Sequence, residues 1–282
     1  MKISIVIVTY NSAETISSCL ESVFKYRNLV DEFIVVDNAS RDKTVEKVKK
    51  FNSVKLIENK KNLGFAAANN IGIKQSKSPY VFLLNPDAIV IKGLDLLIEQ
   101  IERDNKIGII GPKLVNADGS LQKEMTYFPG LFNQILILLR LHRLPWIGSL
   151  VYPNYDYNKP QEADHLMGSA LLIRREVFEK VGLFDENFFV WFEETDLEKR
   201  AKAAGFKIVY YPKTVVSHKV GESTSQLNFF KRQTIWNQSL LYYFKKNCGI
   251  KWLLLIPFTL FSFIPAALFS LKKVILSYFI VK

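Results

Sequence analysis

The chain has 282 residues, and its 38 Lys and Arg against 27 Asp and Glu give a net charge of +11. This excess is modest and scattered along the sequence, which argues against a nucleic-acid-binding arm, and 49% hydrophobic residues exclude a disordered chain. Cys19 and Cys248 are too few for a disulfide framework or a four-thiolate zinc site, so a reducing compartment is expected. The apolar run near the N-terminus has one charge and no small-residue cleavage site, which favours a first strand over a signal peptide.

The first part of the chain alternates between predicted strands and predicted helices. Apolar, largely β-branched runs predict strands at 3–8, 33–36, 54–57 and 80–84. Apolar residues at helical spacing predict helices at 16–24, 45–51 and 65–74, with Asn11 or Ser12 capping the first. Such alternation is typical of βαβ units in a doubly wound sheet.

Three polar clusters come directly after predicted strands. They are Thr9-Tyr10-Asn11, Asp37-Asn38-Ala39-Ser40 and Asn85-Pro86-Asp87. Ligands of doubly wound sheets bind outside the carboxyl ends of the strands, so three clusters at one edge favour a binding site. For any single cluster, an ordinary polar loop is the alternative.

Neither common phosphate-binding loop is present in the sequence. There is no G-x-G-x-x-G after the first strand and no G-x-x-x-x-G-K-[ST], which disfavours dinucleotide dehydrogenases and P-loop NTPases. A bound diphosphate would need another source of positive charge. Asp87 can supply it by holding a divalent cation, the alternative being an ordinary turn or cap before a helix near 94–101.

The sequence from about Gly108 onwards is less regular. A hairpin turn is predicted at 116–119. The segment 131–151 is apolar but carries Arg140, His142 and Arg143, which is typical of a helix lying on an anionic membrane surface. A core helix with a solvated basic stripe is the alternative.

The segment 188–205, FFVWFEETDLEKRAKAAG, follows a predicted strand at 166–173 and a predicted helix at 175–181. The run from Thr195 to Glu198 matches a capping box, which predicts a helix from Asp196 to Gly205. Glu193 and Glu194 would then precede the helix, behind a wall of aromatic side chains.

These two acids are candidates for a poised general base. Apolar surroundings and a neighbouring acid raise the pKa of a carboxyl group, whereas a helix N-terminus lowers it. The alternative is that Glu193, Glu194 and Asp196 cap the helix. In that case they would pair with nearby basic residues, which are Lys199, Arg200 and Lys202.

Taken together, residues 1–225 resemble the inverting glycosyltransferases of family 2, which have the GT-A fold, and within them a rhamnosyltransferase-like subgroup. The motifs that carry the resemblance are IVIVTYNS (5–12), FIVVDNASRD (33–42), NLGFAAANNIGI (62–73), LLNPDA (83–88), the run 167–197 and SHKVGES (217–223). A single motif would be weak, but the set occurs in the family's order. The implied fold is a Rossmann-like mixed α/β sheet flanked by helices, with an apolar membrane-associating segment after it.

The resemblance implies roles for residues on both sides of a cleft. The donor nucleotide and its sugar are expected to contact Thr9, Tyr10, Asn11, Asp37, Asn38, Asn62, Gly64, Asn69 and Asn85. The acceptor side is expected to include Gly168, Ser169, Trp191 and Asp196. The pair Glu193-Glu194 aligns with the family's acidic pair, whose second member serves as the catalytic base.

The resemblance also implies a divalent metal, Mg²⁺ or Mn²⁺. The run from Asn85 to Asp87 takes the place of the family's Asp-x-Asp motif, with only the last acid present. With the first carboxylate missing, a weaker metal affinity at the same position is expected. His218 matches a position that completes the metal site, although without the motif a structural loop histidine would be the ordinary interpretation.

The C-terminal region predicts association with a membrane. Residues 252–271 contain no charge and would span about 30 Å as a helix, enough to cross a bilayer. Pro257 and Pro265 favour a kinked helix or a shallow hairpin as much as a span, and a buried core helix is the alternative. Basic residues on both sides suit the cytoplasmic leaflet.

The expected organisation is therefore a transferase domain followed by a membrane-associating tail. Residues 1–225 form the domain, with a nucleotide-binding half at about 1–110 and an acceptor half at about 111–225, followed by a basic amphipathic connector (226–251) and the tail (252–282).

The expected function is transfer of a sugar, a deoxyhexose such as rhamnose, to a lipid-linked or polysaccharide acceptor with inversion. The donor would be dTDP-rhamnose or a UDP-sugar. The protein would act at the cytoplasmic face of the cell membrane, in cell-envelope glycan synthesis. No nucleic-acid partner is expected. A sugar-nucleotide nucleotidyltransferase and a non-catalytic binding protein on the same fold are the alternatives.

Overall fold

The computed structural model describes residues 2–151, 153–219 and 227–263. The chain forms two compact units. Unit 1 comprises Met1–Phe128 and Tyr155–Ser223, and unit 2 comprises Pro129–Asn154 and Thr224–Lys282. Residues 129–154 thus differ from the expectation that they belong to the acceptor half, because their helices pack on those of the C-terminal region.

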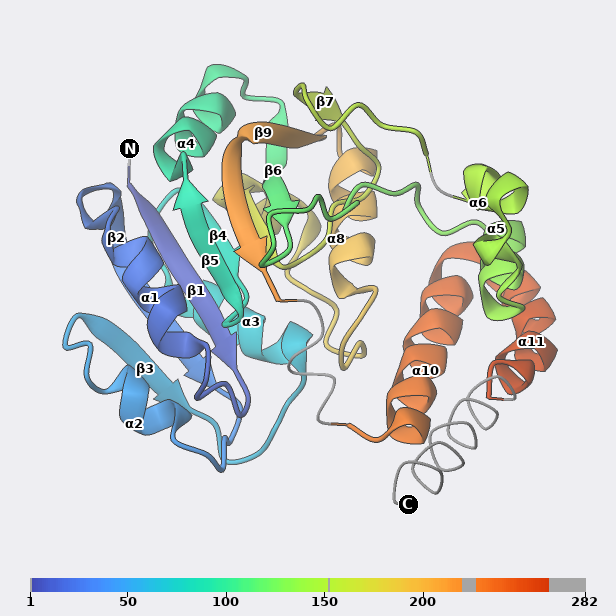
Figure 1. The fold of residues 1–282 in the computed structure, drawn as a ribbon, viewed down its shortest axis with the longest axis horizontal. Coiled ribbons are helices and arrows are strands. Elements are labelled where there is room, and N and C mark those ends of the chain that lie inside the picture. Colours follow the sequence, from blue (N-terminus) through green and yellow to red (C-terminus); the bar gives the residue numbers. More distant parts are fainter. Residues whose placement is uncertain (1, 152, 220–226, 264–282) are drawn as a thin grey trace, which may run out of the picture. The chain divides into compact units, whose positions relative to one another are not determined.

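Unit 1 contains one nine-stranded mixed sheet in the order β3-β2-β1-β4-β8-β6-β9-β5, with β7 paired to β9 (Figure 1). The strands are β1 (Ile3–Thr9), β2 (Val30–Asp37), β3 (Val54–Glu58), β4 (Tyr80–Leu84), β5 (Ala88–Lys92), β6 (Ile107–Val115), β7 (Gln161–Glu162), β8 (Ala170–Arg174) and β9 (Lys207–His218). Strands β1 to β4 pair in parallel, whereas β8 pairs antiparallel with both β4 and β6. The first four strands therefore form the expected Rossmann-like half, and β8 joins it to the second half.

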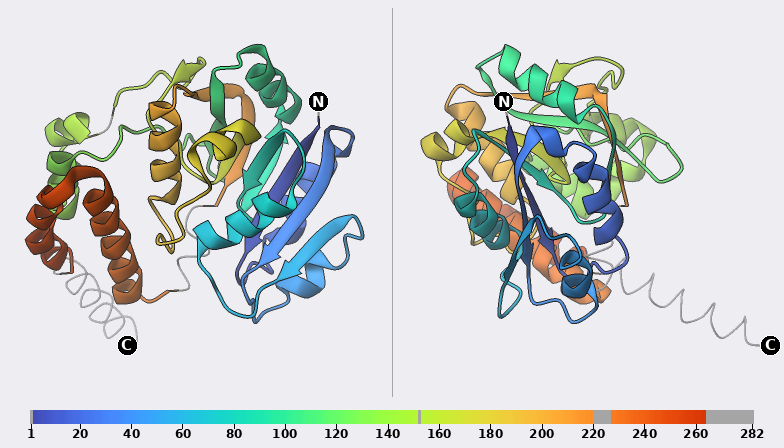
Figure 2. Two further views of the ribbon diagram at one scale, coloured as in Figure 1. Left: turned by 180° about the vertical axis from the view of Figure 1, so that it is seen from behind. Right: turned by 90° about the vertical axis from the view of Figure 1, so that its left-hand side faces the viewer.

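Helices cover both faces of this sheet (Figures 1 and 2). They are α1 (Ile16–Phe24), α2 (Thr44–Val48), α3 (Phe65–Gln75), α4 (Leu94–Arg103), α7 (Arg175–Val181) and α8 (Glu193–Ala203), with the short turn η1 (Arg27–Leu29). Alternate residues of β1 enter two separate cores, because successive strand side chains point to opposite faces. One core contains apolar residues of α1, α2 and α4, and the other contains residues of α3, α7 and α8. Both faces of the strands are buried, which explains their continuous apolar runs.

The start of α8 differs from the prediction. The helix begins at Glu193, so Thr195 and Glu198 lie inside it and the expected capping box does not form. Trp191 and Phe192 adopt left-handed backbone angles, with φ of 69° and 71°, and Asp196 N donates to Phe192 O at 2.9 Å. This turn brings the chain into the helix three residues early and places both glutamates in its first turn.

The cap of α1 also differs from the prediction. The backbone carbonyl of Ser12, not a side chain of Asn11 or Ser12, accepts from Thr15 N and Ile16 N. The hairpin turn at 116–119 is confirmed by the bond from Gly119 N to Asn116 O and by the bridge between Val115 and Leu121.

Unit 2 is helical in the part that the structure describes. It contains α5 (Leu131–Leu138), η2 (Leu141–Arg143), α6 (Pro145–Val151), α10 (Phe229–Cys248), η3 (Gly249–Leu255) and α11 (Ile256–Phe261). The helix expected over 131–151 is interrupted at Arg140, whose φ is 59°. None of the described helices is both long and apolar enough to span a bilayer. Residues 264–271 of the expected membrane segment, and 220–223 of the last motif, lie outside the described residues.

The two units differ sharply in net charge. The excess of Lys and Arg over Asp and Glu is therefore not scattered along the sequence, as expected, but lies in unit 2. Unit 2 holds ten of the 38 Lys and Arg residues in the sequence and none of the 27 Asp and Glu residues. Unit 1 therefore accounts for 11 − 10 = 1 of the net positive charge.

Candidate active site

The loops after β1 and β2 meet at the edge of the sheet. Thr9 and Asp37 are register partners at the ends of these strands, and Thr9 Oγ1 donates to Asp37 Oδ1 at 2.7 Å. Ser40 N donates to Asp37 Oδ2 at 2.9 Å, and Asn11 N donates to Ser40 Oγ at 2.8 Å. Ser40 Oγ also donates to Asp37 Oδ1, at 2.5 Å. Asp37 is 2% exposed, so a ligand would meet a carboxylate already held in place by three donors.

These two loops contain unusual backbone angles. Asn11 has a φ of 48° and Ala39 a φ of 61°, whereas alanine rarely adopts positive φ. Tyr10, between Thr9 and Asn11, is half-buried and its N donates to Ser12 Oγ at 3.4 Å. Strain of this kind often gathers where a loop must present groups to a ligand.

Asn38 ties the second cluster to the loop before α3. Its Nδ2 donates to Gly64 O at 3.1 Å, and its Oδ1 accepts from Asn59 Nδ2 at 2.9 Å. Asn62 Oδ1 accepts from Gly64 N, and Asn69 Nδ2 donates to Phe65 O. The structure therefore brings Asn38, Asn62, Gly64 and Asn69 together, and the side-chain amide of each asparagine forms a hydrogen bond with a nearby backbone atom.

Gly64 is required by a close approach of two segments. Its φ is 89°, and a Cβ at this position would lie 2.5 Å from Phe189 O. Phe65 N, next to it, donates to Phe189 O at 2.7 Å. The aromatic segment before α8 is thus fixed against the start of α3.

Asp87 and His218 face each other across the β5–β9 pair. Ala88, next to Asp87, is the register partner of His218, and Asp87 Oδ1 lies 3.5 Å from His218 Nε2. Both residues are buried, and Asp87 Oδ1 has no hydrogen-bond partner within the described residues. A carboxylate oxygen suits Mg²⁺ or Mn²⁺ and an imidazole nitrogen suits a first-row transition metal, so the two residues together fit a divalent metal.

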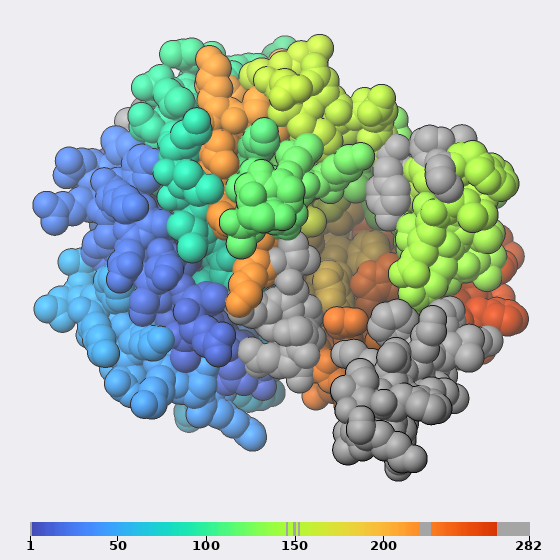
Figure 3. Space-filling model, in the orientation of Figure 1, coloured from blue at the N-terminus to red at the C-terminus, as the bar shows by residue number. Residues whose placement is uncertain are grey.

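Gln122, which the sequence did not single out, orients His218. Gln122 Nε2 donates to His218 O at 2.6 Å, so its Oε1 is the atom that faces His218 Nδ1 at 3.2 Å. An amide oxygen can only accept, so Nδ1 carries a proton in this arrangement, and Nε2 is the ring nitrogen that would be available to a metal beside Asp87. Figure 3 shows the green segment that follows β6 lying against the orange strand β9. In the described residues no cluster of three or more His, Cys, Asp or Glu is found, so a bound metal would need further ligands from the donor or water.

Glu193 and Glu194 are the first two residues of α8. Glu193 is 2% exposed, and burial, together with the charge of Glu194, raises the pKa of Glu193 well above its ordinary value. Glu193 therefore tends to keep its proton. Glu194 Oε2 is buried, and no described residue hydrogen-bonds to it.

Gly168 gives Glu194 its space. A Cβ on Gly168 would lie 3.3 Å from Cγ, Cδ and Oε1 of Glu194, closer than most side chains tolerate. The following residue, Ser169, is 2% exposed and its Oγ lacks a hydrogen-bond partner in the described part of the chain.

One backbone hydrogen bond joins the two sides. Asn85 N, two residues before Asp87, donates to Ser169 O at 2.9 Å, and Leu84 is paired with Ala170 in the β4–β8 ladder. The loop that carries Asp87 is therefore adjacent to the turn that packs on Glu194. Four buried polar atoms of the loops and the helix start described here have no hydrogen-bond partner among the described residues, and they are Asp87 Oδ1, Ser169 Oγ, Glu193 Oε2 and Glu194 Oε2.

His165 and Glu198 lie beside this acidic pair. His165 Nδ1 is 2.5 Å from Glu198 Oε2, and Leu166 N donates to Glu198 Oε1 at 3.1 Å. Burial raises the pKa of Glu198 to about 7, and His165 partly offsets this effect. Burial lowers the pKa of His165, but the charges of Glu198 and Glu194 raise it on balance. Sequence reasoning missed both residues, because it assigned Glu198 to a capping box.

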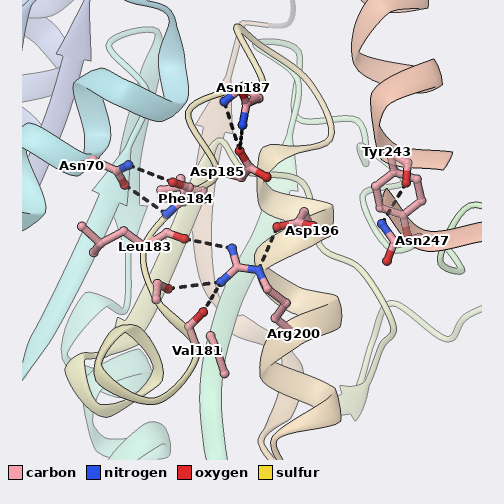
Figure 4. A network of polar contacts seen from close by, with 11 residues as sticks. Asn70, Val181, Leu183, Phe184, Asp185, Asn187, Asp196, Arg200, Tyr243 and Asn247 are labelled. Carbon is pink, nitrogen blue, oxygen red and sulfur yellow. Dashed lines mark hydrogen bonds and ion pairs between the residues drawn. The ribbon is translucent and has the colours of Figure 1, made fainter. Parts of the chain in front are cut away.

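A second network fixes the loop between α7 and α8 (Figure 4). Arg200 donates to the carbonyls of Val181 and Leu183, and its Nε donates to Asp196 Oδ2 at 2.8 Å. Asn70 Nδ2 donates to Phe184 O while Phe184 N donates back to Asn70 Oδ1. Asp196 is 1% exposed and forms an ion pair with Arg200. This pairing matches the alternative in which Asp196 stabilises the helix, and not the acceptor-side role expected for it.

Comparisons with known proteins agree with this architecture. The chain is 29% identical over 238 residues to N-acetylglucosaminyl-diphospho-decaprenol L-rhamnosyltransferase of Mycobacterium tuberculosis, covering 79% of this chain and 77% of that protein. It is 30% identical over 212 residues to the low-salt glycan biosynthesis hexosyltransferase Agl10 of Haloferax volcanii, covering 73% of this chain and 63% of that protein.

Solved structures share the fold. The crystal structure of GalNAc-T7 with UDP, GalNAc and Mn²⁺ matches with a TM-score of 0.58 at 20% identity, over 77% of this chain and 44% of that chain. The expected GT-A-like mixed sheet flanked by helices is thereby confirmed. The family model of glycosyl transferase family 2 matches residues 4–182, more than half of the chain. The protein therefore belongs to glycosyl transferase family 2 and is a glycosyltransferase.

Proposed function

We propose that the protein transfers a sugar with inversion from a nucleoside diphosphate donor to an acceptor hydroxyl, with Glu194 as the general base. The acceptor oxygen forms a bond to the anomeric carbon while the bond from that carbon to the diphosphate oxygen breaks. The hydroxyl proton passes to the Glu194 carboxylate, and the electron pair of the broken bond leaves with the nucleoside diphosphate.

The observation that carries this proposal is the bond from Asn85 N to Ser169 O at 2.9 Å. It makes the loop of Asp87 a neighbour of the turn against which Glu194 packs. A leaving group at Asp87 and a base at Glu194 can then act on one sugar ring from its two faces. Attack opposite the leaving group inverts the anomeric configuration.

The residues around Asp87 suit a metal-assisted leaving group. A divalent cation held by Asp87 and His218 would neutralise charge on the departing diphosphate. Gln122 would keep the Nε2 lone pair of His218 available. On the donor side, Asp37 and Thr9 would receive the nucleoside, and Asn62, Gly64 and Asn69 would lie near the sugar or diphosphate.

For the substrates, we propose a deoxyhexose donor such as dTDP-rhamnose, with UDP-sugars next, and a lipid-linked or polysaccharide acceptor of the cell envelope. Support comes from the name of the mycobacterial relative, which specifies rhamnosyl transfer to a lipid diphosphate. We further propose that the protein works at the cytoplasmic face of the cell membrane, as the charge-free sequence 252–271 suggests.

The test is a panel of nucleotide sugars offered to the detergent-purified full chain, with Mn²⁺, with Mg²⁺ and with a chelator. Release of nucleoside diphosphate would be measured with and without a prenyl diphosphate sugar acceptor. Metal-dependent release that increases with acceptor supports the proposal. Binding of nucleotide sugars without turnover under every condition would indicate a non-catalytic binding protein instead.

A further inference from the structure

All the charged residues of unit 2 are basic, and the folding of a helical unit does not require charges of a single sign. Ten basic residues and no acidic residue occur in 129–154 and 224–282, whereas unit 1 is nearly balanced. Basic residues of an ordinary protein surface are interspersed with acids, because mixed signs limit self-repulsion. A surface of one sign instead attracts a partner of the opposite sign.

The same unit carries most of the exposed large apolar side chains. Of 16 such residues in the described part of the chain, 12 belong to unit 2. They come from both of its segments. Phe132 is 64% and Trp146 70% exposed in the first segment, and Ile250 is 79% and Leu260 66% exposed in the second.

This exposure is a property of a folded unit. Helix α5 packs on η3 and α11, and Leu136, Ile147 and Val151 form a small core with Leu255 also fully buried in the unit. Asn237 Nδ2 donates to Thr259 O and to Ser262 Oγ, both at 3.1 Å, which ties α10 to α11. Two segments separated by the whole of β8, α8 and β9 therefore build one body.

The chemistry of this surface selects its partner. A second copy would bring two positively charged bodies together, which repel. A nucleic acid would meet phosphate-binding cations, but exposed leucines and isoleucines offer no face on which bases stack. An anionic bilayer takes both kinds of group, because its headgroups bind Lys and Arg while its acyl boundary accepts the apolar side chains.

We propose that unit 2 is a lipid-binding platform in which the described residues of its two segments, within 129–154 and 227–263, together bind the surface of an anionic bilayer. The proposal rests on the membrane location proposed above, and it adds the lipid class and the contribution of the first segment. Arg143 and Lys251, both exposed, supply charge from the two segments, and Phe132 and Ile250 supply apolar contact.

The experiment is sedimentation of the full chain with phosphatidylcholine vesicles, with and without phosphatidylglycerol, at low and high salt. We expect binding to the anionic vesicles that weakens with salt. Arg143→Gln with Lys251→Gln should weaken it by about 25-fold, about fivefold for each charge removed. The matched control, Lys25→Gln with Arg27→Gln on unit 1, should leave it unchanged.

Phe132→Gln with Ile250→Gln should weaken binding to both kinds of vesicle. Equal, salt-independent binding to neutral and anionic vesicles would overturn the proposal while leaving a membrane location standing, and failure to bind either would overturn both. Tighter binding to a DNA duplex than to anionic vesicles at the same salt would make nucleic acid the partner. Circular dichroism melting of each variant verifies that it is folded.

Discussion

His165 and Glu198 share a 2.5 Å contact one helical turn beyond Glu194, and Glu198 is fully buried. The folded-state pKa values of both groups lie above those of the unfolded chain. The folded protein therefore binds more protons than the unfolded chain from about pH 4.5, the ordinary value for Glu, up to the raised pKa of about 7 for Glu198, and His165 acts in the same direction above its ordinary pKa of 6.5. This pair thus stabilises the fold less as the pH rises through that window.

We expect Glu198→Gln to flatten the fall in the free energy of unfolding between these pH values. The glutamine can still accept from Leu166 N, but it does not titrate and no longer raises the pKa of His165. Urea unfolding at several pH values measures the slope. Glu124 and Glu193, whose pKa values burial also raises, are present in both proteins, so the difference reports the pair. Identical slopes would contradict the assignment.

Glu194→Gln should reduce sugar transfer by about 10² or more, because an amide cannot accept the acceptor proton. Donor affinity, measured by calorimetry, should be unchanged. Glu179→Gln, an exposed change on α7, is the control and should retain full activity. Turnover near that of the wild type in the Glu194 variant would remove it from the role of base.

Asp87→Asn should raise the Mn²⁺ concentration needed for half-maximal activity by about tenfold or more, since an anionic ligand becomes a neutral one. Titration of activity with Mn²⁺ at saturating donor measures this shift. Asp95→Asn, an exposed acid in the first turn of α4, should leave the titration unchanged. An unchanged titration for Asp87→Asn would place the metal elsewhere.

Gly168→Ala should lower kcat with little effect on donor affinity. Its methyl group would come within 3.3 Å of the Glu194 carboxyl group and displace it by a few tenths of an ångström. Misplaced catalytic groups slow proton transfer steeply. Gly130→Ala, where a Cβ would meet nothing within 4 Å, is the control. Equal kcat values for the two variants would show that Glu194 tolerates the methyl group.

Arg200→Met should destabilise the fold by about 3 kcal/mol, because it removes the ion pair to buried Asp196 and the hydrogen bonds to two loop carbonyls. Arg103→Met removes an ion pair of the same i,i+4 spacing, with Glu99, from the surface and should cost less than about 1 kcal/mol. Denaturant unfolding compares the two. Similar costs would mean that the Arg200 network contributes little to stability.

The sequence determined the local elements and the polar edge. Strand β4 and helix α7 have the expected bounds, because their apolar spacing is a property of neighbouring residues. The clusters at Thr9, Asp37 and Asp87 follow strands for the same reason, and so could be placed at one edge of a sheet without coordinates.

Only the tertiary structure decided how distant segments meet. The insertion of β8 between β4 and β6, the bond from Gln122 to His218 across 96 residues and the grouping of 129–154 with α10 and α11 leave no mark in a local pattern. At α8 the local pattern predicted the wrong first residue. Glu198 was expected to cap the helix, but it lies inside the helix and contacts His165. Hydrogen bonds and burial between residues far apart in the chain outweigh the smaller preferences of a single helix end.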